Sequence, residues 1–406
     1  MSSSVKAALD GIRVLDLGRY QAGPRCALMF ARMGAEVIKI EALAGDESRQ
    51  NGPRVRGQSA YWVQYNSGKK SLALNLREDR GKEVLRDLAK ISDVLVQNFR
   101  PGTIKRMGFG YDELKALNPG IVMVNVSAYG QYGPYRDRVG FDPIGQAIGG
   151  LMSLTGFPDG PPTRTFFPLI DRMTALHATI GALAALWERQ FSGEGQSIDV
   201  SLADTGFTTN EIPIAAYLGN GTVTPREGNG VGLSNAYPTA DGWVFIAAVS
   251  DNIWPRVCEA LGMTAWVEDP RLATRGQRQE HADELEPALA DWFSKRSTQE
   301  AVDILASHDI PAAPVNDVEH AANDPHLRAR EMMVEVPDPV AGSIHVAGKM
   351  IKFGRTPMVV GSTPTVGEHT RQILIEVLGY SESEVQALSE ERVVAVGETE
   401  VPAAEA

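Results

Sequence analysis

Asp171 combines two features that suit an aspartate to covalent chemistry. It follows an apolar run, 166–170, and it opens the longest helical pattern in the chain, which continues to about Arg189. A helix N-terminus favours an ionised carboxylate by about 1 kcal/mol. An ionised carboxylate with dry apolar neighbours can act as a nucleophile. The simpler alternative is an ordinary N-cap aspartate, which is very common.

The other candidate motifs do not match known cofactor or metal patterns. The turn 18–24 has two glycines five residues apart, unlike the GxGxxG turn that binds dinucleotides. Segment 68–71 (GKKS) lacks the upstream glycine of a Walker A loop. Cys26 and Cys258 show no zinc spacing, so we expect free thiols in a reducing cytosol. We therefore expect no metal and no permanently bound cofactor.

The charge balance bears on the class of ligand. With 39 basic and 51 acidic residues, the formal net charge is −12, so we expect no nucleic-acid partner. Basic residues nevertheless gather early in the chain, a pattern that suits a polyphosphate ligand held by charge-assisted bonds. Solvated surface charges would give the same pattern. The residues are Arg54, Arg56, Lys69, Lys70, Arg77, Arg80, Arg100, Lys105 and Arg106.

The elements that would position these residues alternate between short apolar strands and helices. Strands are predicted at 12–17, 36–40, 72–76, 93–97, 121–127 and 197–202, and helices at 24–33, 81–91, 111–117 and 171–189. This alternation indicates βαβ units and a parallel sheet. Ligands of such sheets lie beyond the carboxyl ends of the strands, where the turn 18–24 would be.

The texture of the sequence changes after about residue 205. A glycine-rich loop at 219–232 is followed by a predicted hairpin at 237–249 and then by polar helices. We expect a large domain in 1–205, a small domain in 226–330, a return to the large domain in 331–395 and a disordered tail in 396–406.

Targeting signals are not apparent in the sequence. The N-terminal residues lack the apolar core of a secretory signal. The longest apolar stretch, Ala175 to Trp187, is shorter than the roughly 20 residues that a membrane span needs. We therefore expect a soluble, cytoplasmic protein that does not bind a membrane.

Taken in order, several segments resemble class III CoA-transferases of the CaiB/BaiF type. The match runs through residues 5–380, and the family includes formyl-CoA, carnitine and succinyl-CoA-dependent transferases together with α-methylacyl-CoA racemases. The resemblance is carried by LDGIRVLDLGRYQAGP, GAEVIKIEALAGD, DVLVQNFRPGTIKRMGFGYDELKALNPGIVMVNVSAYGQYGP, GFDPIGQAIGGLMSLTGFPDGPP, the Asp171 helix, GQSIDVSLAD, DGWVFIAA and GEHTRQIL.

The resemblance implies an α/β fold and a covalent mechanism. The fold would be a Rossmann-like large domain with a parallel sheet, a smaller α+β domain and an interlocked homodimer. The substrates would be an acyl-CoA and a carboxylic acid. Asp171 matches the family's nucleophile, which would form an aspartyl–acyl anhydride and then an aspartyl-CoA thioester. These steps require only an ionised nucleophile protected from water.

Further site residues carry over from the same resemblance. Gln21 and Ala22 match catalytic positions beside the nucleophile, where backbone N–H groups would stabilise developing negative charge. Gly228–Gly232 matches a loop that covers the active site in formyl-CoA transferase, although here it reads GNGVG. The positions expected around the CoA nucleotide and phosphates are Leu74, Arg77, Asn98, Phe99, Arg100, Arg106 and Met107.

Two departures from the family pattern bear on the reaction. Ala42 and Phe141 stand where formyl-CoA transferase has an arginine and a tyrosine, which weakens formyl-CoA and oxalate as substrates. The racemases carry a histidine at the second position of Gly-Phe141-Asp142, and phenylalanine cannot move a proton. We therefore predict a CoA-transferase, with succinyl-CoA as a candidate donor. The alternatives are a racemase or epimerase and a non-catalytic CoA-binding homologue.

The sequence does not name the acids, but it offers candidate residues for the acid pocket. Arg164 or Arg172 would hold a dicarboxylate, and each fits a surface arginine equally well. Possible lining residues, each of which fits plain core equally well, are Phe157, Phe166, Phe167 and Tyr237.

Overall fold

The computed structural model describes residues 5–230 and 233–397, and its contacts divide the chain into two compact units. The first unit takes the chain up to Leu151, Arg164–Ile212 and the chain from Ala329 onward, and the second takes Met152–Thr163 and Pro213–Arg328. The second unit thus includes segments 152–163 and 213–225, which the sequence analysis left outside the small domain. The predicted domain boundaries stay predictions.

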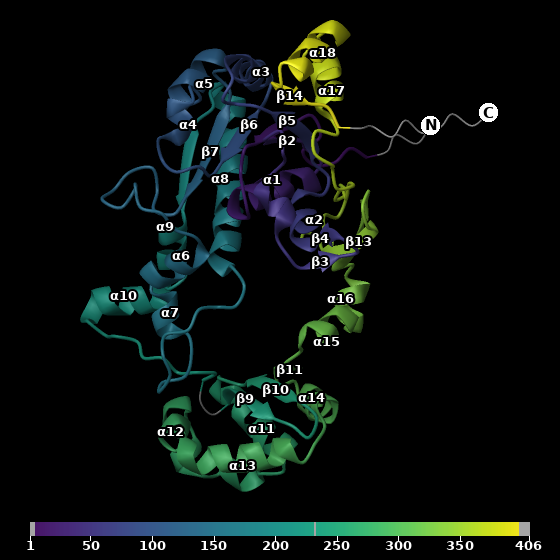
Figure 1. Ribbon diagram of the computed structural model, residues 1–406. Helices are drawn as coiled ribbons and strands as arrows, with labels where there is room; N and C mark the ends of the chain where they lie inside the picture. Colours follow the sequence, from purple (N-terminus) through teal and green to yellow (C-terminus); the bar gives the residue numbers. More distant parts are fainter. Residues whose placement is uncertain (1–4, 231–232, 398–406) are drawn as a thin grey trace, which may run out of the picture. The chain divides into compact units, whose positions relative to one another are not determined.

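A seven-stranded sheet with the order β14-β5-β2-β1-β6-β7-β8 forms the centre of the first unit (Figure 1). Neighbouring strands are parallel except for β14, which pairs antiparallel with β5. The expected α/β fold with a mainly parallel sheet is therefore confirmed. The strands are β1 (Arg13–Asp16), β2 (Glu36–Glu41), β5 (Lys70–Leu74), β6 (Val94–Gln97), β7 (Val122–Ser127), β8 (Ser197–Ser201) and β14 (Val394–Ala395).

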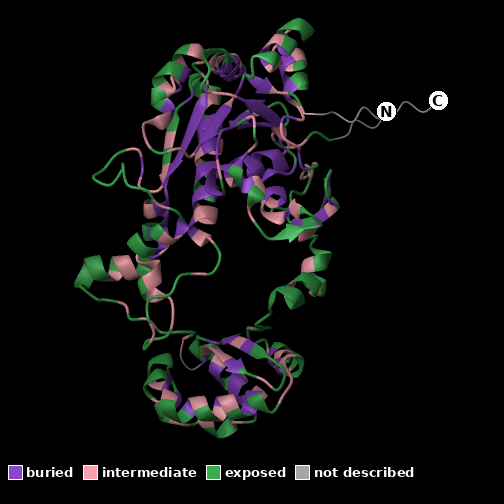
Figure 2. Cartoon of the chain, viewed as in Figure 1, coloured by how far each residue is buried: buried purple, intermediate pink, exposed green. Residues whose placement is uncertain are grey.

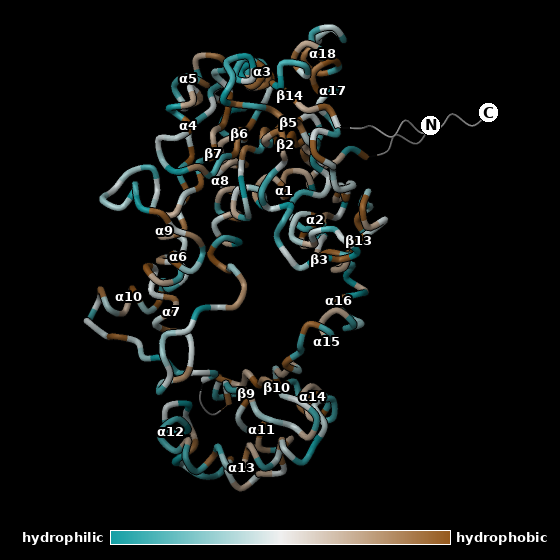
Figure 3. Tube along the Cα trace, in the orientation of Figure 1, coloured by the Kyte–Doolittle hydropathy of each residue, from teal (hydrophilic) through white to brown (hydrophobic). Residues whose placement is uncertain are grey.

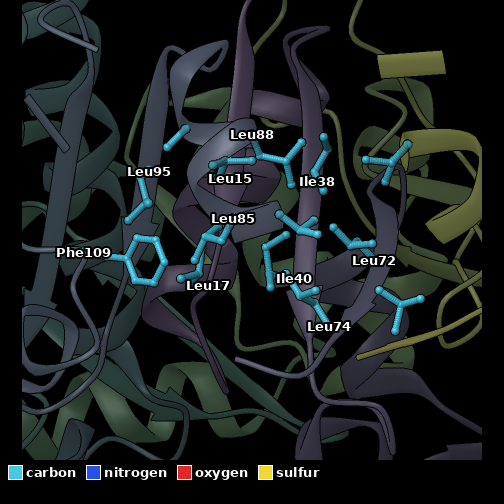
Figure 4. Close-up of a cluster of buried hydrophobic side chains, with 14 of the residues drawn as sticks. Leu15, Leu17, Ile38, Ile40, Leu72, Leu74, Leu85, Leu88, Leu95 and Phe109 are labelled. Atoms are coloured by element: carbon cyan, nitrogen blue, oxygen red, sulfur yellow. The ribbon is translucent and has the colours of Figure 1, made fainter. Parts of the chain in front are cut away.

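Helices cover both faces of this sheet because successive strand residues point to opposite sides. Val14 belongs to the core formed with α1 (Ala22–Arg32) and α8 (Leu169–Ser192). Leu15 points the other way, into the core formed with α3 (Asp79–Lys90) and α5 (Tyr111–Leu117). Figure 4 shows part of this core, with Leu15 near Leu85 and Leu88 of α3. The C-terminal helix α18 (Glu382–Glu390) packs into this second core.

Burial explains why the sequence predicted these strands well. Buried residues are concentrated in the sheet and in the helices beside it (Figure 2). Many of the hydrophobic residues of the chain lie in the same elements (Figure 3). Strands buried on both faces have nearly continuous apolar sequences, which makes them easy to recognise.

The remaining elements of the first unit are short or lie outside the central layers. A hairpin near the C-terminal part pairs β12 with β13, and β3 pairs with β4. The bounds are β3 (Arg54–Val55), β4 (Gln58–Ser59), α2 (Ala60–Asn66), α4 (Thr103–Arg106), α6 (Asp142–Ile148), α9 (Leu202–Thr208), β12 (Met333–Asp338), β13 (Gly342–Ala347) and α17 (Thr370–Gln372).

The second unit is built on a small antiparallel sheet with the order β11-β10-β9. The predicted hairpin is confirmed, with Asp241 and Gly242 in its turn. Tyr237 is buried and stacks on Phe293 with ring centroids 4.8 Å apart, so it is a core residue of this unit. The elements are β9 (Ser234–Pro238), β10 (Trp243–Ala247), α11 (Trp254–Leu261), α12 (Arg275–Glu280), α13 (Ala282–Ser294), α14 (Thr298–Ser307), β11 (Ala312–Pro314), α15 (Val318–Asn323) and α16 (Pro325–Ala329).

Two helices run from one unit into the other, and two segments discussed above lie partly outside the described residues. Two further helices, α7 (Leu151–Leu154) and α10 (Glu211–Asn220), begin in the first unit and end in the second. The expected loop 228–232 is described only to residue 230, and most of the expected tail 396–406 lies outside the described residues.

Helix α8 is longer than the apolar stretch recognised in the sequence. Among the described residues it alone is long and apolar enough, by length and composition, to cross a membrane. Such a result is weak evidence, because the core helix of a soluble protein passes the same test. One side of α8 packs against the sheet through residues such as Ala175 and Ala182.

Candidate active site

A cleft of about 470 Å³ opens at the carboxyl ends of the central strands. Its walls come from the segments that follow β1, β6 and β7, together with the start of α8. This is the edge at which parallel sheets of this kind bind their ligands. Six residues predicted for the site line this cleft, namely Gln21, Ala22, Asn98, Phe99, Arg100 and Asp171.

Asp171 lies in the first turn of α8, which begins at Leu169. The N-cap position belongs to Pro168, and no side chain caps this helix, so the N-cap alternative for Asp171 is wrong. Burial raises the pKa of the Asp171 carboxyl to about 7, and repulsion from Asp142 adds to the shift. No basic side chain among the described residues forms an ion pair with it.

Asp142 holds the start of α8 through a hydrogen bond to its backbone. It is the first residue of α6, it is only 3% exposed, and its Oδ2 accepts the backbone N–H of Asp171 at 2.9 Å. The side-chain amide of Gln146 donates to the other Asp142 oxygen, and the Gln146 Oε1 accepts the N–H of Thr165 at 2.9 Å. These bonds hold the segment that leads into Asp171. The sequence pattern pointed to Phe141 and did not identify Asp142 as a site residue.

The aromatic residues of α2 approach the site from another side. Burial is the main cause that raises the pKa of the Tyr61 hydroxyl, and the charges of Tyr65 and Asp171 raise it further. Tyr61 thus lies within electrostatic reach of Asp171, and the sequence pattern did not identify it as a site residue. Its only sequence signal is its place in an aromatic segment, which ordinary core packing would also explain.

The turn after β1 brings Gln21 and Ala22 to the cleft. Gln21 precedes the first residue of α1, and the first N–H groups of a helix have no partner within it. They are thus available to an oxygen that gains negative charge. The Gln21 side-chain amide donates to the Pro168 carbonyl at 3.4 Å, which ties this turn to the start of α8.

Two buried lysines hold this turn in place. Asp16 Oδ1 accepts the Gly18 N–H at 2.8 Å, and Asp16 Oδ2 pairs with Lys69 Nζ at 2.7 Å. Lys69 also donates to the Pro24 carbonyl at 2.9 Å. Lys39 pairs with Asp46 at 2.9 Å and donates to the Gly18 carbonyl. The turn is therefore fixed at both ends by charge-assisted bonds.

This arrangement corrects the expectation of a basic phosphate-binding cluster. Lys69 is completely buried in its ion pair, and Lys70 pairs with Glu36 at 2.7 Å. Arg80 pairs with Glu391, so it too is occupied. Of the nine basic residues in that cluster, Arg77 and Arg100 line the clefts at this edge.

A second cleft of about 490 Å³ adjoins the first, since Arg19 and Phe99 line both. Leu74, Arg77 and Met107, all expected near CoA, lie in its wall together with Ala42. Arg106 lines neither cleft, and its guanidinium donates to Thr103 Oγ1 at 3.0 Å.

The residues expected to line the acid pocket line neither cleft. Phe157, Phe166 and Phe167 are exposed, and Tyr237 is a core residue of the second unit. Phe141 lines the first cleft instead and packs edge-on against Tyr20 with ring centroids 6.0 Å apart. Cys26 and Cys258 are buried free thiols, as predicted, and burial raises the pKa of each to about 12.

Comparison with known proteins identifies the family. The model of CoA-transferase family III matches residues 9–370. The chain is 39% identical to the succinyl-CoA–D-citramalate CoA-transferase of Chloroflexus aurantiacus, over 95% of this chain and 98% of that one. It is 34% identical to the formyl-CoA:oxalate CoA-transferase of Rhodopseudomonas palustris, over 93% and 95%.

A solved structure agrees with this assignment. The CAIB/BAIF family protein from Brucella suis has a TM-score of 0.82 and 31% sequence identity, and the match covers 92% of this chain and all of that one. The likeness thus covers both the fold and the sequence. The chain therefore belongs to CoA-transferase family III and is a CoA-transferase.

Proposed function

We propose that this protein moves CoA from an acyl-CoA, with succinyl-CoA as the donor, to a carboxylic acid through covalent intermediates on Asp171. The observation that carries the proposal is the position of Asp171. Its carboxylate forms no ion pair among the described residues and is partly buried in the wall of a cleft that Gln21 and Ala22 also line. A relative that uses succinyl-CoA supports the choice of donor.

The proposed steps balance without any added reagent. An Asp171 oxygen attacks the thioester carbonyl, the C–S bond breaks, and CoA leaves as a thiolate. The thiolate attacks the Asp171 carbonyl of the anhydride, which releases the donor acid and forms the aspartyl-CoA thioester. The acceptor carboxylate repeats these two steps in reverse order and leaves as the new acyl-CoA.

Each tetrahedral intermediate carries an oxyanion, and the start of α1 can stabilise it. The buried ion pairs hold the turn in advance, so no reorganisation is needed as the charge develops. Burial also makes the Asp171 carboxylate more basic than an exposed aspartate, which favours attack on an acyl carbon. We include Gln21 and Ala22 in the catalytic site on this basis.

We assign the two adjoining clefts to CoA. Arg77 and Arg100 would pair with its phosphates, and the apolar side chains of Leu74, Phe99 and Met107 would line its nucleotide end. Asn98 binds the turn itself, since its Oδ1 accepts the Arg19 N–H at 2.7 Å. Arg106 would have to release Thr103 before it could reach a phosphate.

We also propose a homodimer in the cytoplasm. The outer side of α8 exposes Ile180, Trp187 and Phe191, which are 63%, 68% and 74% exposed in the single chain. Apolar side chains gathered on one helix face usually mark an interface. A second copy of the chain would cover them, and buried free cysteines suit a reducing compartment.

Mass spectrometry after incubation with succinyl-CoA tests the covalent mechanism. Quenching with hydroxylamine or borohydride should leave a modification on Asp171, while the buried neighbour Asp142 stays unmodified and serves as the internal control. If a protein that binds CoA shows no modification with any acyl-CoA, the covalent proposal is wrong.

A further inference from the structure

Arg25 and Arg172 lie in α1 and α8, and neither has a counter-ion among the described residues. Arg25 is in the first turns of α1, where its N–H donates to the Gln21 carbonyl at 2.8 Å, and Arg172 follows Asp171 in α8. Both side chains are partly buried, and the Nε atom of each is buried without a hydrogen-bond partner. Among the described residues, neither guanidinium forms an ion pair.

Arg25 and Arg172 are linked through the start of α8. The side-chain amide of Gln21, which lies one turn before Arg25, donates to the Pro168 carbonyl at 3.4 Å, and the Arg172 N–H donates to the same carbonyl at 3.3 Å. Burial lowers the pKa of Arg25, and the positive charge of Arg172 lowers it further. Both arginines thus lie near the helix start that carries Asp171.

Other partly buried arginines of the same unit are treated differently by the fold. Arg49 pairs with Glu41 at 2.7 Å, and Arg189 pairs with Asp93 at 2.8 Å. A charge withdrawn from water without a partner is costly, and two such charges close together cost more. The contact of the Arg172 guanidinium with the Phe167 ring, 5.2 Å from the ring centroid, is a cation–π contact and not an ion pair, so a bound anion would supply the missing partner.

The anion is not expected to be a phosphate of CoA. Neither arginine lines the two clefts that contain the residues assigned to CoA. A carboxylate matches the planar guanidinium group in shape and can accept two parallel hydrogen bonds from it. The remaining substrate of the proposed reaction is an acid, and its reacting end must reach Asp171.

We propose that Arg25 and Arg172 bind the second carboxylate of a dicarboxylic acid whose first carboxylate reacts at Asp171. This inference rests on the proposed function and narrows its substrate class to dicarboxylic acids. The arginine pair would hold the acid at its far end, which places the reacting carboxylate next to the nucleophile. Monocarboxylic acids of the same length would lack this anchor.

Paired substrates test the proposal. Succinate and butyrate have the same chain length and differ in one carboxylate. Each is assayed as an isotopically labelled CoA acceptor, with unlabelled succinyl-CoA as donor and the label in the acyl-CoA product as readout, for wild type, Arg172→Gln and Arg25→Gln. We expect either substitution to raise the KM for succinate about 10–100-fold, the range expected when a hydrogen bond to a charged group is lost. The ratio of kcat/KM for succinate to that for butyrate should fall with it.

Controls separate a binding role from a structural one. Arg371→Gln removes an exposed arginine of the C-terminal part, away from the clefts, and should leave the ratio unchanged. Arg172→Lys keeps the charge and should retain part of the preference. Succinate, but not butyrate, should raise the melting temperature of the wild type, and Arg172→Gln should abolish that shift. This readout does not depend on turnover.

Three outcomes would overturn the inference. They are an equal loss for both acids, an unchanged ratio, or a change in the oligomeric state of the arginine variants with no change in acid preference. The last would assign the arginines to the contact between subunits. Failure of the proposed function looks different, because the wild type would then transfer CoA to no member of a series of mono- and dicarboxylic acids.

Discussion

Asp16 and Asp171 are aspartates of the first unit, the former buried and the latter partly buried in the wall of a cleft, and their surroundings make them chemically different. Asp16, at the end of β1, receives the Lys69 ammonium at 2.7 Å and the Gly18 N–H at 2.8 Å. Asp171 forms no ion pair with the described basic side chains, and burial together with the charge of Asp142 raises its pKa to about 7. A counter-ion makes the first aspartate a structural support, and we assign the second one to catalysis.

The comparison separates two uses of buried charge within one fold. Around Asp16, every charge has a partner, and the result is a fixed turn. By contrast, Asp171, Arg172 in α8 and Arg25 in α1 form no ion pair among the described residues, and we assign them to substrates. Substitutions can test this division directly.

Removal of the Asp171 carboxylate should have the largest effect. Asp171→Ala should lower kcat by about 10⁴-fold or more, as loss of a covalent nucleophile does in other enzymes. CoA binding, measured by calorimetry, should change little because the CoA residues lie elsewhere in the clefts. Asp10→Ala, at an exposed aspartate, is the control. A variant that retains turnover would remove Asp171 from the mechanism.

Breaking the Asp16–Lys69 pair should mainly reduce stability. Lys69→Met leaves Asp16 buried without its cation, which should lower the free energy of unfolding by about 3–5 kcal/mol in urea titrations. Lys70→Met removes the neighbouring lysine from a partly exposed pair and should cost only about 1 kcal/mol. Adding Asp16→Leu to Lys69→Met should recover part of the loss. Equal losses for the two lysines would contradict the comparison.

The raised pKa of Asp171 should make folding stability depend on pH. Its pKa is about 7 in the folded state against 3.8 in the unfolded state, so the folded state binds more protons between these values. The free energy of unfolding should therefore fall as the pH rises from about 4 to 7, by at most about 4 kcal/mol at 1.36 kcal/mol per unit.

Asp171→Asn should remove this contribution. The variant should be more stable than the wild type at pH 8 and of similar stability at pH 4, as judged by urea unfolding at both values. A stability difference that stays the same at all pH values would show that Asp171 titrates normally.

Asp142→Asn should have the smallest effect. Asparagine can still accept the Asp171 N–H, but it removes the charge that raises the pKa of Asp171. Because burial is the larger cause, the pH at which Asp171 becomes reactive should fall by about 1 unit or less. The rate of labelling by succinyl-CoA across pH measures it, with the exposed Asp137→Asn as control. An unchanged profile would mean that burial alone sets this pKa.

Much of the fold was predictable because the relevant signals are local. The core strands β1, β2, β6 and β7 have apolar sequences that locate them to within one or two residues. Helices with irregular sequences were missed for the same reason. The α2 segment is rich in aromatic residues with modest helix propensity, and α6 contains Pro143 and Gly145, so tertiary packing decides their conformation.

The sequence by itself determined the family, the mainly parallel sheet and the candidate nucleophile. These depend on ordered motifs, on apolar runs and on one aspartate at the start of a long helix. It also drew attention to Arg172, but together with Arg164, and it grouped Lys69 with surface charges.

Only the tertiary structure decided which charges are paired. Lys69 reaches Asp16 across 53 residues, and the packing of α1 on α8 brings Arg25 within electrostatic reach of Arg172. Burial and electrostatic neighbours determine the state of a charged group, and both arise from residues that are far apart in the chain. For that reason the same residue type is a support at position 16 and a nucleophile candidate at position 171.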